Sequence, residues 1–117
     1  MVFMRGLIVV HAEMGYINDS LISASTAKQN SQLFDIIATE VGIYLHAGDK
    51  VYYLAEESVS PDSELIFPAM REHLAKMVYF PSEIAEGQFL RAKERVMLDG
   101  VDNIAVCGVA YQICVKD

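Results

Sequence analysis

Three residues near the two ends of the chain carry side chains suited to acid–base or nucleophilic chemistry. His11 and Glu13 follow the apolar run 7–10, and Cys114 lies in the segment that begins at Gly108. A histidine can act as a general base, and a cysteine thiolate near a helix N-terminus is a nucleophile. The alternative is a histidine bonded to loop backbone and a cysteine packed as a small hydrophobic residue. His11, Glu13 and Cys114 are therefore the candidate catalytic residues.

Motifs for cofactors and metals give no support for either kind of ligand. Neither the dinucleotide pattern G-x-G-x-x-G nor the phosphate-loop pattern G-x-x-x-x-G-K-[ST] occurs in the sequence. His11, Glu13 and Glu56 have side chains that bind metals, but their spacing is not that of a known metal motif. Glu56 and Glu57 are expected to be solvated loop charges, and we expect no cofactor and no metal.

Short apolar runs alternate with helical patterns along the chain, which predicts a parallel α/β sheet. The segment from Ser20 to Ser31 is rich in small polar residues and predicts a loop. Pro68 should interrupt the stretch that starts at Pro61, leaving two short helical pieces before Lys76. The predicted strands are 7–10, 51–54, 77–80 and 104–107, and the predicted longer helices are 31–47 and 82–99.

The ends of these strands predict where a site should lie. In open parallel sheets, ligands bind outside the carboxyl ends of the strands. Four segments occupy that position: His11-Ala12-Glu13, Glu56-Glu57-Ser58, Pro81-Ser82-Glu83 and Gly108 to Cys114. We expect His11, Glu13 and Cys114 to lie close together there, in a crevice for a small molecule.

The segment from Asp99 to Val115 resembles the nucleophile region of the isochorismatase-like cysteine hydrolases. It reads DGVDNIAVCGVAYQICV, and the family pattern joins a strand to a helix through a Gly-Val-Ala turn. The resemblance places Cys114 at the nucleophile position and Gly108 at the start of that turn. It implies a three-layer α/β/α, Rossmann-like fold with strand order 3-2-1-4.

Two other catalytic positions of that family are occupied differently. The resemblance places His11 where the family has an aspartate that acts as general base, and Glu13 where it has a glutamine. The family lysine, which follows the third strand, has no counterpart in Val78 to Ser82, and Lys76 precedes that strand. The family's fifth and sixth strands have no counterpart either. These departures imply a divergent, truncated relative, active or inactive. A non-enzymatic oligomeric or partner-binding domain is the alternative.

The composition of the chain indicates its domain count, its oligomeric state and its classes of partner. The 117 residues suit a single α/β domain over 1–117, of which 53% are hydrophobic. So much apolar surface on a small domain predicts a homo-oligomer, most simply a dimer. The net charge of −7 argues against nucleic acid as a partner. No apolar run is long enough to span a membrane, and we expect a cytoplasmic protein whose cysteines are thiols.

Overall fold

Four parallel strands form the centre of the computed structural model, which describes residues 4–56, 59–81 and 85–108. Their order across the sheet is β3-β2-β1-β4. The two central strands are rich in β-branched and aromatic residues, as expected for strands buried on both faces. The predicted strands and the predicted order are confirmed. The strands are β1 (Arg5–Val10), β2 (Lys50–Leu54), β3 (Val78–Phe80) and β4 (Asn103–Gly108).

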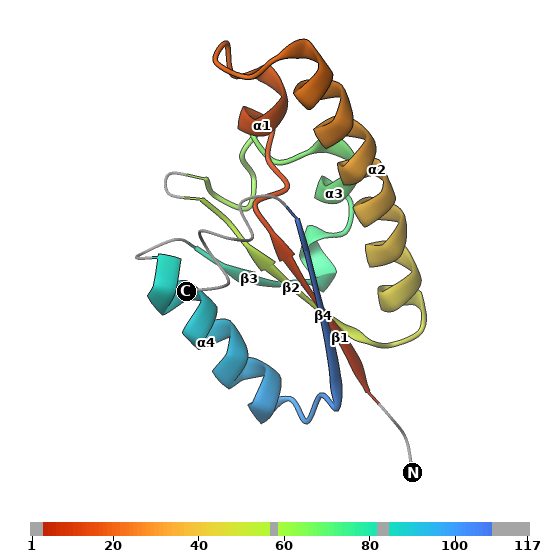
Figure 1. The fold of residues 1–117 in the computed structure, drawn as a ribbon. Coiled ribbons are helices and arrows are strands. Elements are labelled where there is room, and N and C mark those ends of the chain that lie inside the picture. The colour runs from red at the N-terminus through yellow and green to blue at the C-terminus, as the bar shows by residue number, and fades with distance from the viewer. Residues whose placement is uncertain (1–3, 57–58, 82–84, 109–117) are drawn as a thin grey trace.

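Helices cover both faces of the sheet, so the three-layer arrangement is confirmed. Figure 1 shows α2 and α3 on one face and α4 on the other. The short helix α1 follows β1 and packs against α2. The helices are α1 (Gly15–Asn18), α2 (Ala24–His46), α3 (Pro68–Arg71) and α4 (Ala85–Leu98), with a 3-10 turn, η1 (Leu74–Lys76).

The register of the sheet brings three strand ends to one edge. Val10, the last residue of β1, pairs with Leu54 of β2 and with Gly108 of β4. Both pairings are parallel, so the chain leaves all three strands on the same side of the molecule. Residues that follow these strands are therefore brought together although they lie far apart in the sequence.

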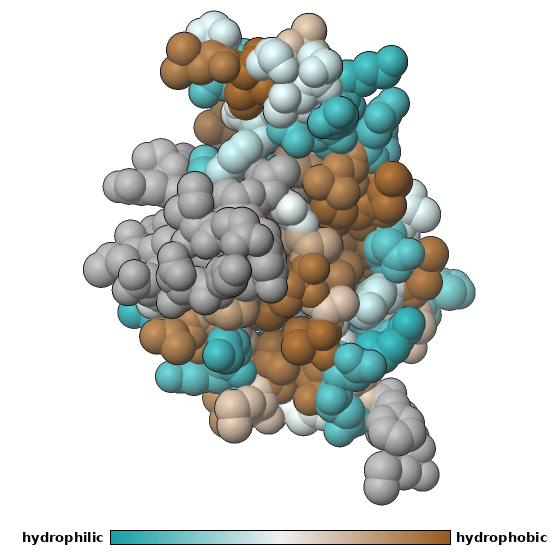
Figure 2. Space-filling view, in the orientation of Figure 1, coloured by the Kyte–Doolittle hydropathy of each residue, from teal (hydrophilic) through white to brown (hydrophobic). Residues whose placement is uncertain are grey.

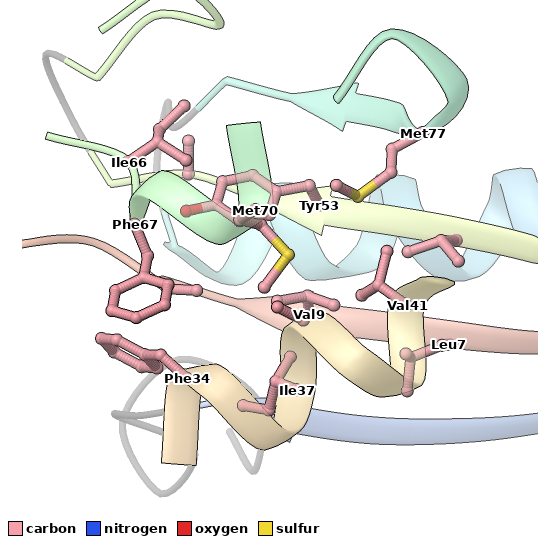
Figure 3. Close-up of a cluster of buried hydrophobic side chains, with 14 of the residues drawn as sticks. Leu7, Val9, Phe34, Ile37, Val41, Tyr53, Ile66, Phe67, Met70 and Met77 are labelled. Carbon is pink, nitrogen blue, oxygen red and sulfur yellow. The ribbon is translucent and has the colours of Figure 1, made fainter. Parts of the chain in front are cut away.

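Each face of the sheet has its own core. The larger core lies under α2 and α3, where the rings of Phe34 and Phe67 meet edge to face with centroids 5.4 Å apart (Figure 3). The smaller core lies under α4 and includes Ala92. Tyr53 belongs to the larger core and Tyr52 to the smaller one, as the two-residue period of a strand predicts.

The predicted loop from Ser20 to Ser31 is wrong, because α2 begins at Ala24. Ser23 is the N-cap, and its hydroxyl oxygen accepts a hydrogen bond from the Thr26 N–H at 3.2 Å. The first turns of α2 are largely exposed, so they lack the apolar stripe on which the prediction depended. Although α2 has 23 residues, neither it nor any other helix in the described part of the chain is apolar enough to cross a membrane.

The segment between β2 and β3 also departs from expectation. Pro61 lies in a turn, and no helix starts there. Pro68 begins α3 instead of interrupting a helix, because the first helical position needs no backbone N–H donor. Two short helical pieces are present, as predicted, but the first starts at Pro68 and the second comes after it.

The surface around α4 and β4 is apolar. Leu90 and Met97 of α4 are exposed, whereas Gln88 is buried. A groove of about 280 Å³ between α4 and β4 is lined mainly by apolar side chains, and Figure 2 shows hydrophobic residues gathered on this face. β4 is an edge strand without charged residues. Association into a dimer stays a prediction.

Replacing Ser23 with alanine tests where α2 begins. Ser23→Ala removes the cap acceptor and should lower the free energy of unfolding by about 1 kcal/mol. Ser31→Ala is the matched control, because Ser31 lies within the helix, where alanine is favourable. Urea unfolding followed by circular dichroism measures both variants. A loss at Ser31 and none at Ser23 would contradict the observed helix start.

Replacing Gly108 tests the close approach of β4 to β1. Gly108 has φ +122°, and an added Cβ would lie 2.1 Å from the Val10 carbonyl oxygen. Gly108→Ala should therefore lower the free energy of unfolding by more than about 3 kcal/mol, the upper end of backbone strain alone. Gly48→Ala is the control: its φ is +82° but the space around it is open. Equal losses in the two variants, measured by urea unfolding, would contradict the predicted clash.

Candidate functional site

His11 is the first residue after β1 and adopts an unusual backbone conformation. Its φ is +54°, a value that non-glycine residues seldom adopt. The His11 N–H donates to the Leu54 carbonyl oxygen at 2.9 Å, which extends the pairing of β1 with β2. The residue is buried. Strain of this kind persists only where the surrounding structure enforces it, and it is concentrated at functional sites.

The imidazole of His11 lies against Tyr16 and Glu56. Its Nδ1 is 3.4 Å from the Tyr16 hydroxyl and 3.6 Å from Glu56 Oε1. The two rings are nearly parallel, with an interplanar angle of 16°. The Tyr16 hydroxyl also donates a hydrogen bond to Glu56 Oε1. Burial lowers the pKa of His11, while the Glu56 charge and a hydrogen bond with Gln88 oppose that shift.

Glu13 is buried and joins the ends of two strands. Its Oε1 accepts from the Glu56 N–H at 2.9 Å, and its Oε2 accepts from the Tyr53 hydroxyl. Burial raises the pKa of Glu13 to about 7, although both hydrogen bonds favour the ionised form. The Glu56 charge adds to the rise. Glu13 is therefore close to half-protonated at neutral pH.

Two stacked tyrosines lie close to Glu13. The rings of Tyr53 and Tyr79 lie 5.8 Å apart with an interplanar angle of 12°. Burial and the nearby Glu13 raise the pKa of both hydroxyls, that of Tyr79 to about 12. The Tyr79 hydroxyl donates to the Val59 carbonyl oxygen. Both tyrosines are therefore neutral hydrogen-bond donors at physiological pH.

Backbone contacts hold the segment after β1 in place. The Phe67 N–H donates to the Ala12 carbonyl oxygen at 2.9 Å, and Glu13 forms an isolated antiparallel bridge with Ile66. The Met14 N–H donates to the Leu65 carbonyl oxygen. The positions of His11 and Glu13 are thus fixed from one side by β2 and from the other by the segment before α3.

Gln88 reaches the site from α4. Its amide nitrogen donates to the Ala55 carbonyl oxygen at 2.7 Å and to the Phe80 carbonyl oxygen at 2.8 Å. Both carbonyls follow or end a strand, so Gln88 ties α4 to the ends of β2 and β3. Both N–H groups of its amide are therefore engaged by backbone carbonyls.

The candidate nucleophile Cys114 lies outside the described residues, as do Glu57, Ser58, Ser82 and Glu83. The described cysteine, Cys107, is in β4, and its thiol faces the Ile8 carbonyl oxygen at 3.7 Å. Burial raises the pKa of Cys107 to about 12, so it is a poor nucleophile.

The described residues hold no cluster of three or more side chains suited to a metal ion. Both oxygens of Glu13 accept hydrogen bonds from the protein, which leaves His11 and Glu56 of the metal-binding set considered from the sequence. The geometry suits proton transfer: a neutral imidazole beside an exposed carboxylate and a phenol.

The strand-end rule placed His11, Glu13 and Glu56 at this edge, with Glu56 expected as a solvated loop charge. Three residues that position them were missed: Tyr16, Gln88 and Tyr53, whose hydroxyl binds Glu13. Gln88 did carry a signal, because a polar residue on the apolar stripe of a helix is a candidate for buried hydrogen bonding.

Comparisons with known proteins establish the fold. Neither a protein-family model nor a curated protein sequence matches the chain. Solved structures do: a nicotinamidase from Staphylococcus aureus has a TM-score of 0.69 and 17% identity, over 97% of this chain and 71% of that one. A nicotinamidase from Bacillus subtilis has a TM-score of 0.73 and 12% identity, over 97% of this chain and 75% of that one.

An isochorismatase from Pseudomonas putida is similar in the same way. Its TM-score is 0.72 at 16% identity, over 96% of this chain and 59% of that one. Identities this low show the fold alone. The chain therefore has the α/β fold of the isochorismatase-like hydrolases, with the strand order that the resemblance implied.

Glu13→Gln tests the buried carboxyl through stability. The pKa of Glu13 is raised from its ordinary 4.5 to about 7, so the folded state binds the proton more tightly than the unfolded state. Stability should therefore fall as pH rises from about 4.5 through 7, by about 3 kcal/mol in total. Glutamine is neutral throughout and accepts from the Glu56 N–H while donating to the Tyr53 oxygen. The variant should lack this fall.

Urea unfolding at pH 5 and pH 8 measures the effect as a difference between variant and parent. The lowered pKa of His11 acts in the opposite direction, since it costs stability as pH falls below 6.5, and it cancels in that difference. Glu64→Gln, at an exposed position, controls for the change in net charge. If Glu13→Gln and Glu64→Gln show the same pH dependence, Glu13 does not have a raised pKa.

Proposed function

We propose that this chain binds a small carbonyl compound at the carboxyl ends of β1, β2 and β4, and that Cys114 and His11 form a nucleophile–base pair there. The observation that carries the proposal is the strained, buried His11 at the end of β1. Val10, which precedes it, pairs with Gly108, from which the chain continues to Cys114. The similarity to solved nicotinamidases and an isochorismatase supports a hydrolase of the same fold.

The proposed reaction is an acyl transfer to sulfur. His11 takes the proton of the Cys114 thiol, and the sulfur forms a bond to the carbonyl carbon of a small amide or ester. The leaving amine or alcohol departs with the proton that His11 holds. Water then cleaves the thioester, supplying the hydroxyl of the carboxylic acid and returning a proton to sulfur.

The neutral resting form of His11 suits it to the role of base. Its pKa is lowered, so the imidazole is neutral near pH 7 and able to accept a proton. Glu13 acts indirectly, as a positioning residue. It binds the Glu56 N–H and the Tyr53 hydroxyl, and so it fixes the chain on both sides of His11.

Alkylation by iodoacetamide tests the pair. The reagent forms a carbon–sulfur bond and releases iodide, and mass spectrometry separates modification at Cys114 from that at Cys107. We expect Cys114 to react much faster than Cys107, whose pKa is raised to about 12. His11→Ala should slow the Cys114 reaction at pH 7 roughly tenfold or more, at the lower end of general-base effects.

The matched control is His46→Ala, which removes an exposed histidine in the last turn of α2. It should leave the alkylation rate unchanged. Cys114→Ser should abolish the fast modification and leave the slow one. If His11→Ala and His46→Ala alkylate at the same rate as the parent protein, the proposed pair does not exist.

A further inference from the structure

We propose that Glu56 is the carboxylate that stabilises the protonated form of His11, with Tyr16 holding that carboxylate in place. The site then contains a Tyr16–Glu56–His11 relay. The inference rests on the proposed function only for the identity of the thiol that His11 serves. The charge coupling between Glu56 and His11 is a property of the described residues alone.

The distances place the three polar groups in mutual contact. Glu56 Oε1 lies 3.6 Å from His11 Nδ1 and accepts a hydrogen bond from the Tyr16 hydroxyl. The same hydroxyl lies 3.4 Å from His11 Nδ1. One carboxylate oxygen therefore faces both a ring nitrogen and a phenol, and the phenol limits the directions in which the carboxylate can turn.

The backbone of Glu56 is fixed as well. Its N–H donates to Glu13 Oε1 at 2.9 Å, and its carbonyl oxygen accepts from the Val59 N–H at 3.2 Å. A glutamate on an unconstrained loop would gain little from one charged partner, because ordering the side chain costs conformational entropy. Here Glu13 and Tyr16 hold Glu56 before His11 takes up a proton.

The side chains of His11 and Glu56 differ in their exposure to solvent. The His11 side chain is 5% exposed, whereas that of Glu56 is 46% exposed. Glu56 therefore stays in contact with solvent while one of its oxygens reaches a buried ring. When His11 accepts a proton, the new positive charge has the Glu56 carboxylate beside it. Burial without that carboxylate would make the imidazolium costly.

Glu13 and Tyr16 are two further titratable residues close to His11. Both oxygens of Glu13 are bonded to Tyr53 and to the Glu56 backbone. Tyr16 donates its hydroxyl proton to Glu56. Glu56 is consequently the group whose charge acts most directly on His11, in line with its contribution to the pKa of that residue.

The test is the pKa of His11, measured by NMR titration of its ring carbon protons in the Cys114→Ser protein. The chain has three histidines, and His11→Ala identifies the signal of His11. Glu56→Gln keeps the shape and removes the charge, and it should lower the pKa of His11 by about 0.5 to 1 unit, as expected for a partly screened charge. Glu64→Gln, at an exposed position, should leave it unchanged.

His46 and His73 are internal controls, and neither should shift in Glu56→Gln. A second measurement needs no substitution at Glu56: raising NaCl from 0.05 to about 1 M in the Cys114→Ser protein screens the carboxylate, and this should also lower the pKa of His11. It covers the case in which Glu56→Gln fails to fold.

The outcomes separate the two proposals. If neither Glu56→Gln nor salt lowers the pKa of His11, the relay is overturned, whatever the alkylation rates show. If the pKa shifts as expected but His11→Ala leaves Cys114 alkylation unchanged, the nucleophile–base pair fails and the relay stands. If both hold, Glu56→Gln should also slow Cys114 alkylation at pH 7, with Glu64→Gln as the control.

Discussion

The hydrogen bonds of one buried carboxyl hold the site together. Glu13 follows β1, yet it binds the backbone of Glu56 and the hydroxyl of Tyr53, and both belong to β2 or the residues just beyond it. Strand pairing alone ends at Val10 and Leu54. Beyond that point the two segments of the chain would diverge as loops, and the hydrogen bonds of Glu13 continue the connection between them. The placement of Glu56, whose carboxylate lies beside His11, depends on this link.

Burying the Glu13 carboxyl has an energetic cost, which limits the other charged groups that the site can contain. Two hydrogen bonds favour the ionised carboxylate, but burial outweighs them and raises the pKa of Glu13 to about 7. A fully buried second charge beside it would be expensive. The protein avoids that cost by leaving Glu56 half exposed and His11 neutral. The site therefore combines a neutral imidazole with a carboxyl whose pKa is raised to about 7, instead of two buried ions.

The sequence predicted the sheet well because a parallel strand buried on both faces leaves a clear local record. Runs such as Leu7 to Val10 are uncharged and β-branched, and the order of the strands followed from the resemblance. The start of α2 was missed because its first turns are exposed and polar, so helix propensity and the Ser23 cap determine it. Pro68 was misjudged because the same residue can end one helix or begin another, and only the chain around it decides.

The sequence predicted where the site lies but not the hydrogen bonds within it. The strand-end rule located His11, Glu13 and Glu56, since it depends on topology alone. Which oxygen binds which donor depends on contacts across forty residues of sequence, such as Tyr53 to Glu13. No periodicity records such a contact. Tyr53 illustrates the difficulty: its ring is a core residue and its hydroxyl is part of the site, and the sequence pattern reports only the ring.

The histidine at the end of β1, where the resemblance to the isochorismatase-like hydrolases implies an aspartate, sets different requirements on its surroundings. An aspartate used as a base starts charged and becomes neutral when it takes a proton, so burial helps the step. A histidine starts neutral and becomes charged, so burial opposes the step unless a negative group lies nearby. Glu56 supplies that group at 3.6 Å, and Glu13, which is near half-protonation at neutral pH, adds less than a full second charge. A histidine at this position therefore needs the carboxylate that follows β2, and the two residues are best regarded as one unit.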